Sequence, residues 1–164
     1  MRIWAAAALA VLLSTVAARA DELHQAFDAM GAIVKKDGGL VLRQASCPTN
    51  NDNPGQYVVS STVVSVNNTD RAVLVDTGDC GGGNGSWQYL VVILNGAAHV
   101  VTDAGIEDMS FLADHMYAEG DSVFLNGNRW LSNDPHCCPS KKATLQYNLK
   151  TRQHKLTIEG DNKS

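Results

Sequence analysis

The feature that most constrains the fold is segment 87–94, which is apolar on both alternating faces and is followed directly by Asn95-Gly96. A strand with two apolar faces has to be covered on both sides, so this segment predicts a central strand of a sheet. Asn-Gly accepts the two positive φ angles of a type I′ turn, which joins antiparallel strands through two residues. We therefore expect a hairpin between 87–94 and 97–102.

Other runs of β-branched residues are short and are separated by turn residues, as strands of an antiparallel sheet are. They lie at 40–43, 57–66, 72–75, 122–126, 143–149 and 154–158. In 143–149 apolar and polar residues alternate, so we expect one buried face and one wet face. The apolar pattern of residues 106–117 fits either a helix or a strand, and we favour the strand. The predicted fold class is mainly β with a minor α component: an antiparallel meander that forms a sandwich or an open barrel.

The beginning of the mature chain has a helical pattern instead. Its apolar residues recur three and four positions apart, at Leu23, Ala26, Phe27, Met30, Ile33 and Val34. Gly38-Gly39 then ends the pattern. We expect one N-terminal amphipathic helix whose apolar side packs on the sheet, and the alternative is a helix that docks on a partner.

Residues 1–20 have the features of a secretory signal peptide. Arg2 precedes an apolar stretch at 3–16, and Ala18-Arg19-Ala20 forms a cleavage site of the A-x-A type. The apolar stretch is shorter than the roughly 20 residues of a membrane-spanning helix. We expect the mature chain to begin at Asp21, to form a single domain over 21–164, and to reach the periplasm or the medium without membrane insertion.

Net charge bears on the choice of partner. The chain has 13 Lys and Arg against 17 Asp and Glu, a net charge of −4, and removal of Arg2 and Arg19 with the signal makes it −6. An acidic surface argues against nucleic acid as a partner and favours encounter with a cationic protein.

Four cysteines lie in the mature part, an even number that predicts disulfides in an oxidising compartment. They are Cys47, Cys80, Cys137 and Cys138. Adjacent cysteines bond to each other only through a strained ring, so each should reach Cys47 or Cys80, in an order that stays open. Each crosslink would stabilise the fold by about 3 to 4 kcal/mol. The spacing does not suit a tetrahedral zinc site.

Asp76-Thr77-Gly78 follows an apolar strand and resembles the active-site triplet of aspartic proteases. The resemblance implies that Asp76 is a catalytic carboxyl group of a retropepsin-like protease. Such chemistry needs two carboxyl groups that share a proton, and the triplet occurs once, so the chain would have to dimerise. The small residue that follows the triplet in that family is replaced by Asp79. The alternative is a strand that ends in a turn.

The segment after this triplet has four glycines within five residues, which lets the backbone adopt positive φ angles and approach another group closely. It predicts a binding loop made of Asp76, Asp79, Gly81, Gly82, Gly83, Asn84 and Gly85. Backbone N–H groups would hold an anion there, or carboxylates and carbonyls would hold calcium, and we favour a structural loop tied by Cys80 over either. No other cofactor is expected.

Six carboxylates surround His115 in the sequence and could form an acid/base site with it. They are Asp103, Glu107, Asp108, Asp114, Glu119 and Asp121. We interpret them as solvated side chains at strand edges, because scattered acidic residues are common there. His99, His115 and His154 have no metal-ligand spacing, so we interpret them as surface or hydrogen-bonded polar residues.

Residues 134–140 form a D-P-x-C-C-P-S motif. The motif resembles a signature of uncharacterised bacterial envelope proteins and of the mycobacterial LppP/LprE-type lipoproteins. The resemblance implies a small cell-envelope domain with disulfides and implies no activity. The lipid-attachment cysteine of those lipoproteins has no counterpart in this chain.

Three functions fit these features, and the leading one is a non-catalytic periplasmic or secreted binding module. It would act as an inhibitor or immunity-type protein on a cationic partner such as a cell-wall hydrolase. The alternatives are the aspartic-type protease that uses Asp76 and a structural protein of the envelope. Because no catalytic constellation is assembled in the sequence, we lean against an enzyme.

Overall fold

The computed structural model describes residues 21–30, 40–41, 56–79, 86–102, 104, 106, 110–135 and 138–160. The predicted signal peptide at 1–20 lies outside the described residues. Three of the cysteines, Cys47, Cys80 and Cys137, and residues 81–85 of the predicted binding loop lie outside them as well.

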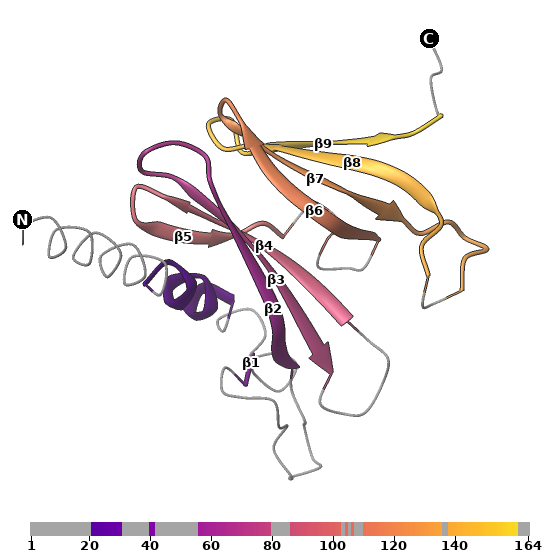
Figure 1. Cartoon of the computed structure of the whole chain (residues 1–164), viewed down its shortest axis with the longest axis horizontal. Helices are drawn as coiled ribbons and strands as arrows, with labels where there is room; N and C mark the ends of the chain where they lie inside the picture. Colours follow the sequence, from indigo (N-terminus) through magenta and orange to yellow (C-terminus); the bar gives the residue numbers. More distant parts are fainter. Residues whose placement is uncertain are drawn as a thin grey trace, which may run out of the picture.

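The first sheet has five strands in chain order (Figure 1). They are β1 (Leu40–Val41), β2 (Gln56–Ser65), β3 (Arg71–Asp79), β4 (Ser86–Leu94) and β5 (Ala97–Val100). The two-residue β1 pairs parallel with β2, and all other neighbours in this sheet are antiparallel.

Strand β3 is longer than the predicted strand at 72–75, and the turn expected at Asp76-Thr77-Gly78 is wrong. All three residues continue the ladder with β4, where Asp76 lies opposite Gln88 and Gly78 lies opposite Ser86. The strand can continue because the carboxylate of Asp76 finds hydrogen-bond donors on neighbouring strands, so the polar residue does not have to leave the sheet.

The predicted hairpin after β4 is confirmed. Leu94 pairs with Ala97 across a two-residue turn, and φ is 50° at Asn95 and 79° at Gly96. Two positive φ angles in succession are the requirement of a type I′ turn. Strand β5 ends at Val100, two residues before the predicted end.

The second sheet is a four-stranded antiparallel meander. Its strands are β6 (Phe111–Glu119), β7 (Ser122–Arg129), β8 (Lys141–Asn148) and β9 (Gln153–Ile158). The prediction of a strand within 106–117 is therefore confirmed from Phe111 onward.

The main core lies between the two sheets, which face each other (Figure 1). From the first sheet it contains alternate residues of β3 and β4, namely Ala72, Leu74, Leu90 and Val92. The second sheet contributes buried residues that include Phe111, Met116, Val123, Leu125, Leu145 and Tyr147. The mainly β class is thus confirmed, and the arrangement is that of a sandwich.

The N-terminal helix, of which residues 21–30 are described, covers the opposite face of the first sheet. Its fully buried Ala26 and Met30 pack in one cluster with Val73, Val75, Tyr89, Val91 and Ile93. Strand β4 is therefore buried on both faces, as its sequence predicted. Glu22 of the helix forms an ion pair of 3.0 Å with Arg71 at the start of β3. Within the described part of the chain, no helix has the length and apolar character needed to cross a membrane.

Candidate functional site

The outer face of the second sheet, which points away from the first sheet, is polar. The side chains on this outer face alternate along the strands with core residues such as Val123 and Leu125. They are Asp114, His115, Tyr117, Phe124, Asn126, Asn128, Lys142, Thr144, Gln146, Asn148, Lys155 and Thr157. The predicted alternation of buried and wet residues in 143–149 is confirmed by β8, whose apolar residues are buried while its polar residues are more exposed.

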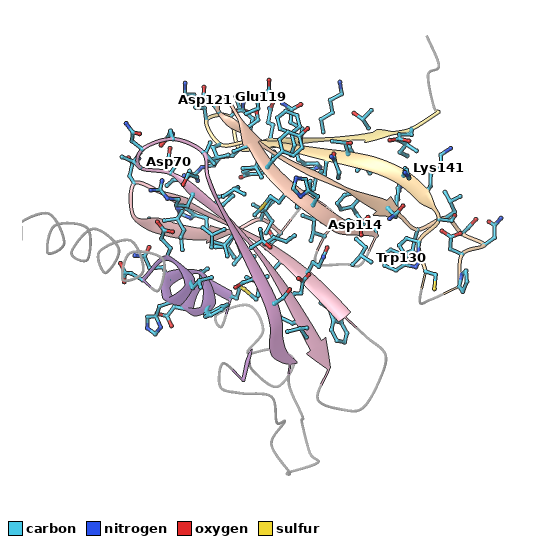
Figure 2. All side chains as sticks on the ribbon, in the orientation of Figure 1. Asp70, Asp114, Glu119, Asp121, Trp130 and Lys141 are labelled. Atoms are coloured by element: carbon cyan, nitrogen blue, oxygen red, sulfur yellow. The ribbon has the colours of Figure 1, made fainter. Side chains whose placement is uncertain are left out.

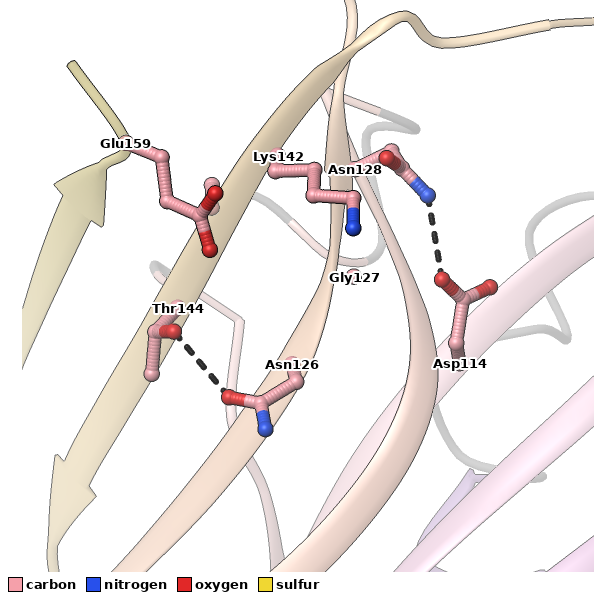
Figure 3. A pocket seen from close by; sticks show the side chains of 8 residues that line it. Asp114, Asn126, Gly127, Asn128, Lys142, Thr144 and Glu159 are labelled. Carbon is pink, nitrogen blue, oxygen red and sulfur yellow. Dashed lines mark hydrogen bonds between the residues drawn. The ribbon is translucent and has the colours of Figure 1, made fainter.

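A pocket of about 290 Å³ opens on one end of this face. It is lined by Asp114, Asn126, Gly127, Asn128, Lys142, Ala143, Thr144 and Glu159. Asn128 donates a hydrogen bond of 3.0 Å to the Asp114 carboxylate, and the Thr144 hydroxyl donates one of 3.0 Å to Asn126 Oδ1 (Figure 3). These bonds hold the polar side chains of neighbouring strands in defined positions.

The ammonium group of Lys142 lies between the two sides of the pocket (Figure 3). The ion pairs among described residues join His24 with Asp28, Arg71 with Glu22 and Lys150 with Asp121. Lys142 is in none of them, although Asp114 and Glu159 line the same pocket. Its charge is thus available to a ligand.

The pocket forms where β6 contains a β-bulge. The register with β7 shifts between Ala113 and His115, so Asp114 is an extra residue with no direct partner. Opposite the bulge, a Cβ on Gly127 would lie 2.0 Å from the backbone oxygen of Leu112. Only glycine therefore permits β6 to pass so close to β7, and the bulge turns Asp114 toward the pocket.

A buried side chain of the first sheet holds this bulge. Gln88, which is 6% exposed, accepts a bond of 2.6 Å from the Ala113 backbone N–H and donates one of 2.8 Å to the Ala113 carbonyl. The same amide donates a bond of 2.7 Å to Asp76 Oδ1, and the Ser60 hydroxyl donates to Asp76 Oδ2. Because a bulge leaves ladder groups unpaired, the bonds from Gln88 satisfy the backbone groups of Ala113, which would otherwise be buried without partners. We call the hydrogen bonds that run from Ser60 through Asp76 and Gln88 to Ala113 the cross-sheet chain.

Asp76, the candidate catalytic residue, is half-buried and is a member of the cross-sheet chain. Its two oxygens accept bonds from Ser60 and Gln88. Its neighbour Thr77 is buried on the other face of β3 and donates a bond of 3.2 Å to the Trp87 carbonyl. These contacts give Asp76 a role in positioning Gln88.

The predicted binding loop is described only at its beginning, where Asp76 lies in β3 and the backbone of Asp79 ends that strand. Whether its glycines hold an anion or calcium stays a prediction. Within the described ranges, no three His, Cys, Asp or Glu side chains are grouped as metal ligands would be.

The carboxylates expected around His115 are spread over the second sheet. Figure 2 places Asp114 far from Glu119 and Asp121, which lie at the β6–β7 turn. Asp121 pairs with Lys150 at 2.6 Å. The other three, Asp103, Glu107 and Asp108, lie outside the described residues.

An aromatic row lies beside the pocket on the outer face. The rings of His115 and Tyr117 stack with centroids 6.0 Å apart, and those of Tyr117 and Phe124 stack with centroids 5.2 Å apart and planes 11° apart. His115 is exposed, as predicted, and so are His99 and His154. The row itself was missed, because it depends on the register that sets Tyr117 opposite Phe124.

Other residues of the site had weak sequence signals. The alternation in 143–149 pointed to Thr144, and Gln88 was the one polar residue between apolar neighbours in segment 87–94. Nothing local distinguished Lys142 from the other lysines of the chain.

The loop with the D-P-x-C-C-P-S motif is organised by Asp134. Its carboxylate accepts bonds from the backbone N–H groups of Leu131 (2.8 Å) and Ser140 (2.9 Å) and from the Ser140 hydroxyl (2.7 Å). These bonds, that from Leu131 foremost, hold the pKa of Asp134 below its ordinary value. The crosslinking of all four cysteines stays a prediction.

Comparisons with protein-family models, with curated protein sequences and with solved structures found no match to this chain.

Proposed function

We propose that this protein is a non-catalytic binding module of the cell envelope and that the outer face of the second sheet is its contact surface. The observation that carries the proposal is the pocket at the β6 bulge, where an unpaired lysine stands among hydrogen-bonded polar side chains. Polar groups that are already ordered on a rigid sheet lose little conformational freedom when they bind a ligand.

The cross-sheet chain supports this proposal because it fixes the pocket from within the core. A buried amide is tolerated only when its hydrogen bonds are made, and Gln88 uses both ends of its amide on the bulge and on Asp76. The sandwich thus holds a local irregularity in place, as expected where a fold presents a side chain for recognition.

The proposed location rests on the sequence. Three sequence features favour the periplasm or the medium. They are the features of a signal peptide in residues 1–20, the even number of cysteines and the D-P-x-C-C-P-S resemblance.

The distribution of charge separates two kinds of partner. Residues 21–109 contain eleven acidic and four basic side chains, whereas residues 110–160 contain five acidic and six basic ones. A cationic protein, the partner favoured by net charge, would therefore be attracted to the part of the chain that precedes residue 110. The nearly neutral second sheet suits a ligand with little net charge.

The protease alternative gains no support from the contacts of Asp76, because its two oxygens accept hydrogen bonds from Ser60 and Gln88. If the alternative were right, the oxidised protein would cleave peptides at acid pH and Asp76→Asn would abolish the cleavage. A protein that cleaves no peptide under these conditions would end that alternative.

Cosedimentation with isolated envelope material tests the binding proposal. The oxidised protein should sediment with the insoluble envelope fraction, and Lys142→Met should weaken this binding about tenfold, because a charged hydrogen bond to the ligand is lost. Lys150→Met is the matched control. Its ammonium is exposed and pairs with Asp121 near the opposite end of the sheet, so its loss should leave binding unchanged.

Two results would overturn the proposal. One is a folded wild-type protein that binds no envelope component. The other is equal binding by wild type and Lys142→Met, which would move the contact surface away from the pocket.

A further inference from the structure

We propose that the pocket and the aromatic row together bind an uncharged saccharide made of hexose units. This inference rests on the proposed function and names its ligand class. One unit would occupy the pocket, and the chain would continue along the outer face over the aromatic row.

The charge of the pocket favours an uncharged ligand. Lys142 is flanked by the carboxylates of Asp114 and Glu159. A phosphate or another anion that approached Lys142 would also meet two negative charges, and a cation would meet the ammonium. A neutral molecule that both donates and accepts hydrogen bonds avoids either repulsion.

The hydrogen-bonding groups match the hydroxyls of a sugar. With its oxygen engaged by Thr144, the amide of Asn126 still presents N–H donors, and Asp114 keeps an oxygen that the bond from Asn128 does not use. Lys142 adds donors and Glu159 adds acceptors. Neighbouring hydroxyls of a hexose donate and accept in turn, so they can be held by such alternating groups.

The size of the pocket fits one sugar unit. Its volume of about 290 Å³ is just below the roughly 300 to 1,000 Å³ of small-molecule sites. A longer ligand therefore has to leave the pocket and lie on the sheet.

The aromatic row lies where such a ligand would leave. His115 is paired with the pocket residue Asn126, and the next pair along the same face is Tyr117 with Phe124. Strand geometry separates successive residues on one face by about 7 Å. The parts of these rings that their neighbours leave uncovered form an apolar strip on which the C–H groups of a sugar can pack, and Gln146, opposite Phe124, offers an amide beside them.

Amide NMR titration of the full-length oxidised protein tests this inference. The probes are oligomers of glucose, oligomers of N-acetylglucosamine and, separately, a cationic lysozyme-type enzyme. We expect a sugar series to shift the amide signals of Asp114, Asn126 and Lys142 first and those of Tyr117 and Phe124 as the oligomer lengthens. The series that binds identifies the sugar.

Two pocket variants and one row variant sharpen the test. Asp114→Asn and Lys142→Met should each weaken sugar binding about tenfold. Tyr117→Leu should weaken binding of long oligomers about threefold and leave the shortest unchanged. Glu119→Gln, at the exposed end of β6, is the control for Asp114→Asn and should bind as wild type does.

The outcomes separate the two proposals. Shifts of the outer face by the enzyme alone would overturn the saccharide and keep the contact surface. Sugar-induced shifts confined to the helix and first sheet would overturn both.

Discussion

Asp134 shows how one carboxylate can hold a loop together. It joins Leu131 at one end of the cysteine loop to Ser140 at the other through three hydrogen bonds. The Asp134 and Ser140 positions of the D-P-x-C-C-P-S motif therefore have a structural explanation that requires no activity. Cys138, between them, donates its backbone N–H to the Pro135 carbonyl at 3.0 Å.

The first prediction concerns the pH dependence of this loop. The pKa of Asp134 is lower in the folded protein than its ordinary value of 3.8, so the ionised form contributes stability. The contribution is complete above the unfolded pKa and is lost as the pH falls through the folded pKa. We expect Asp134→Asn to lower the unfolding temperature at neutral pH. The unfolding temperature of the variant should also decrease less than that of wild type as the pH is lowered.

Thermal unfolding of wild type and Asp134→Asn from neutral to strongly acid pH measures this difference. The two curves should converge at the acid end, where Asp134 is protonated in wild type as well. Curves that stay parallel at every pH would contradict the assignment.

At the scale of the element, β6 and β7 depend on a glycine. A methyl group at position 127 would collide with the Leu112 carbonyl, a backbone atom that moves only if β6 moves. The close approach of the strands and the bulge at Asp114 are thus parts of one arrangement.

The second prediction is that Gly127→Ala destabilises the protein by about 3 kcal/mol, because the added carbon has no space in the sheet. Gly120→Ala is the matched control. Its φ of 59° strains alanine, but nothing lies within 4 Å of the new Cβ, so a cost of about 1 kcal/mol is expected. Urea unfolding of both variants measures the two costs, and equal losses would show that β6 does not press on position 127.

At the scale of the whole molecule, the cross-sheet chain links the two halves of the sandwich. Most of the described residues between the sheets are apolar, whereas the polar side chain of Gln88 reaches from β4 to the backbone of β6. The two hydrogen bonds between Gln88 and Ala113 fix the position of β4 relative to the bulge in β6. The pocket on the outer face is therefore coupled to the core.

The third prediction is that Gln88→Leu costs about 3 kcal/mol of unfolding free energy, because the buried N–H and C=O of Ala113 and a half-buried oxygen of Asp76 lose their partner. Gln146→Leu is the control. Gln146 is half-buried on the outer face and bonds the Ser122 hydroxyl at 3.1 Å, so its loss should cost under about 1 kcal/mol.

Denaturant unfolding and hydrogen exchange at Ala113 report this difference together. Gln88→Leu should accelerate exchange of the Ala113 amide, whereas Gln146→Leu should not. Unchanged protection at Ala113 in Gln88→Leu would show that the bulge is held by something else.

The strands, the hairpin turn and the helix were predictable from the sequence because they depend on neighbours. Three local patterns formed the structures expected of them. They are the two-residue alternation of the strands, the Asn95-Gly96 pair of the turn and the spacing of Ala26 and Met30 in the helix. The true end of β3 was not predictable, since Asp76 stays in the strand through Gln88, a residue on another strand.

The amino-acid sequence by itself determined a mainly β domain with a doubly covered central strand and a wet face on β8, because these follow from the periodicity of apolar residues. Only the tertiary structure decided where the candidate site lies. Gln88 and Ala113 are 25 positions apart, and the sheets bring them into hydrogen-bonding distance. The bulge, the pocket with Lys142 and the aromatic row follow from strand register, which no local pattern records.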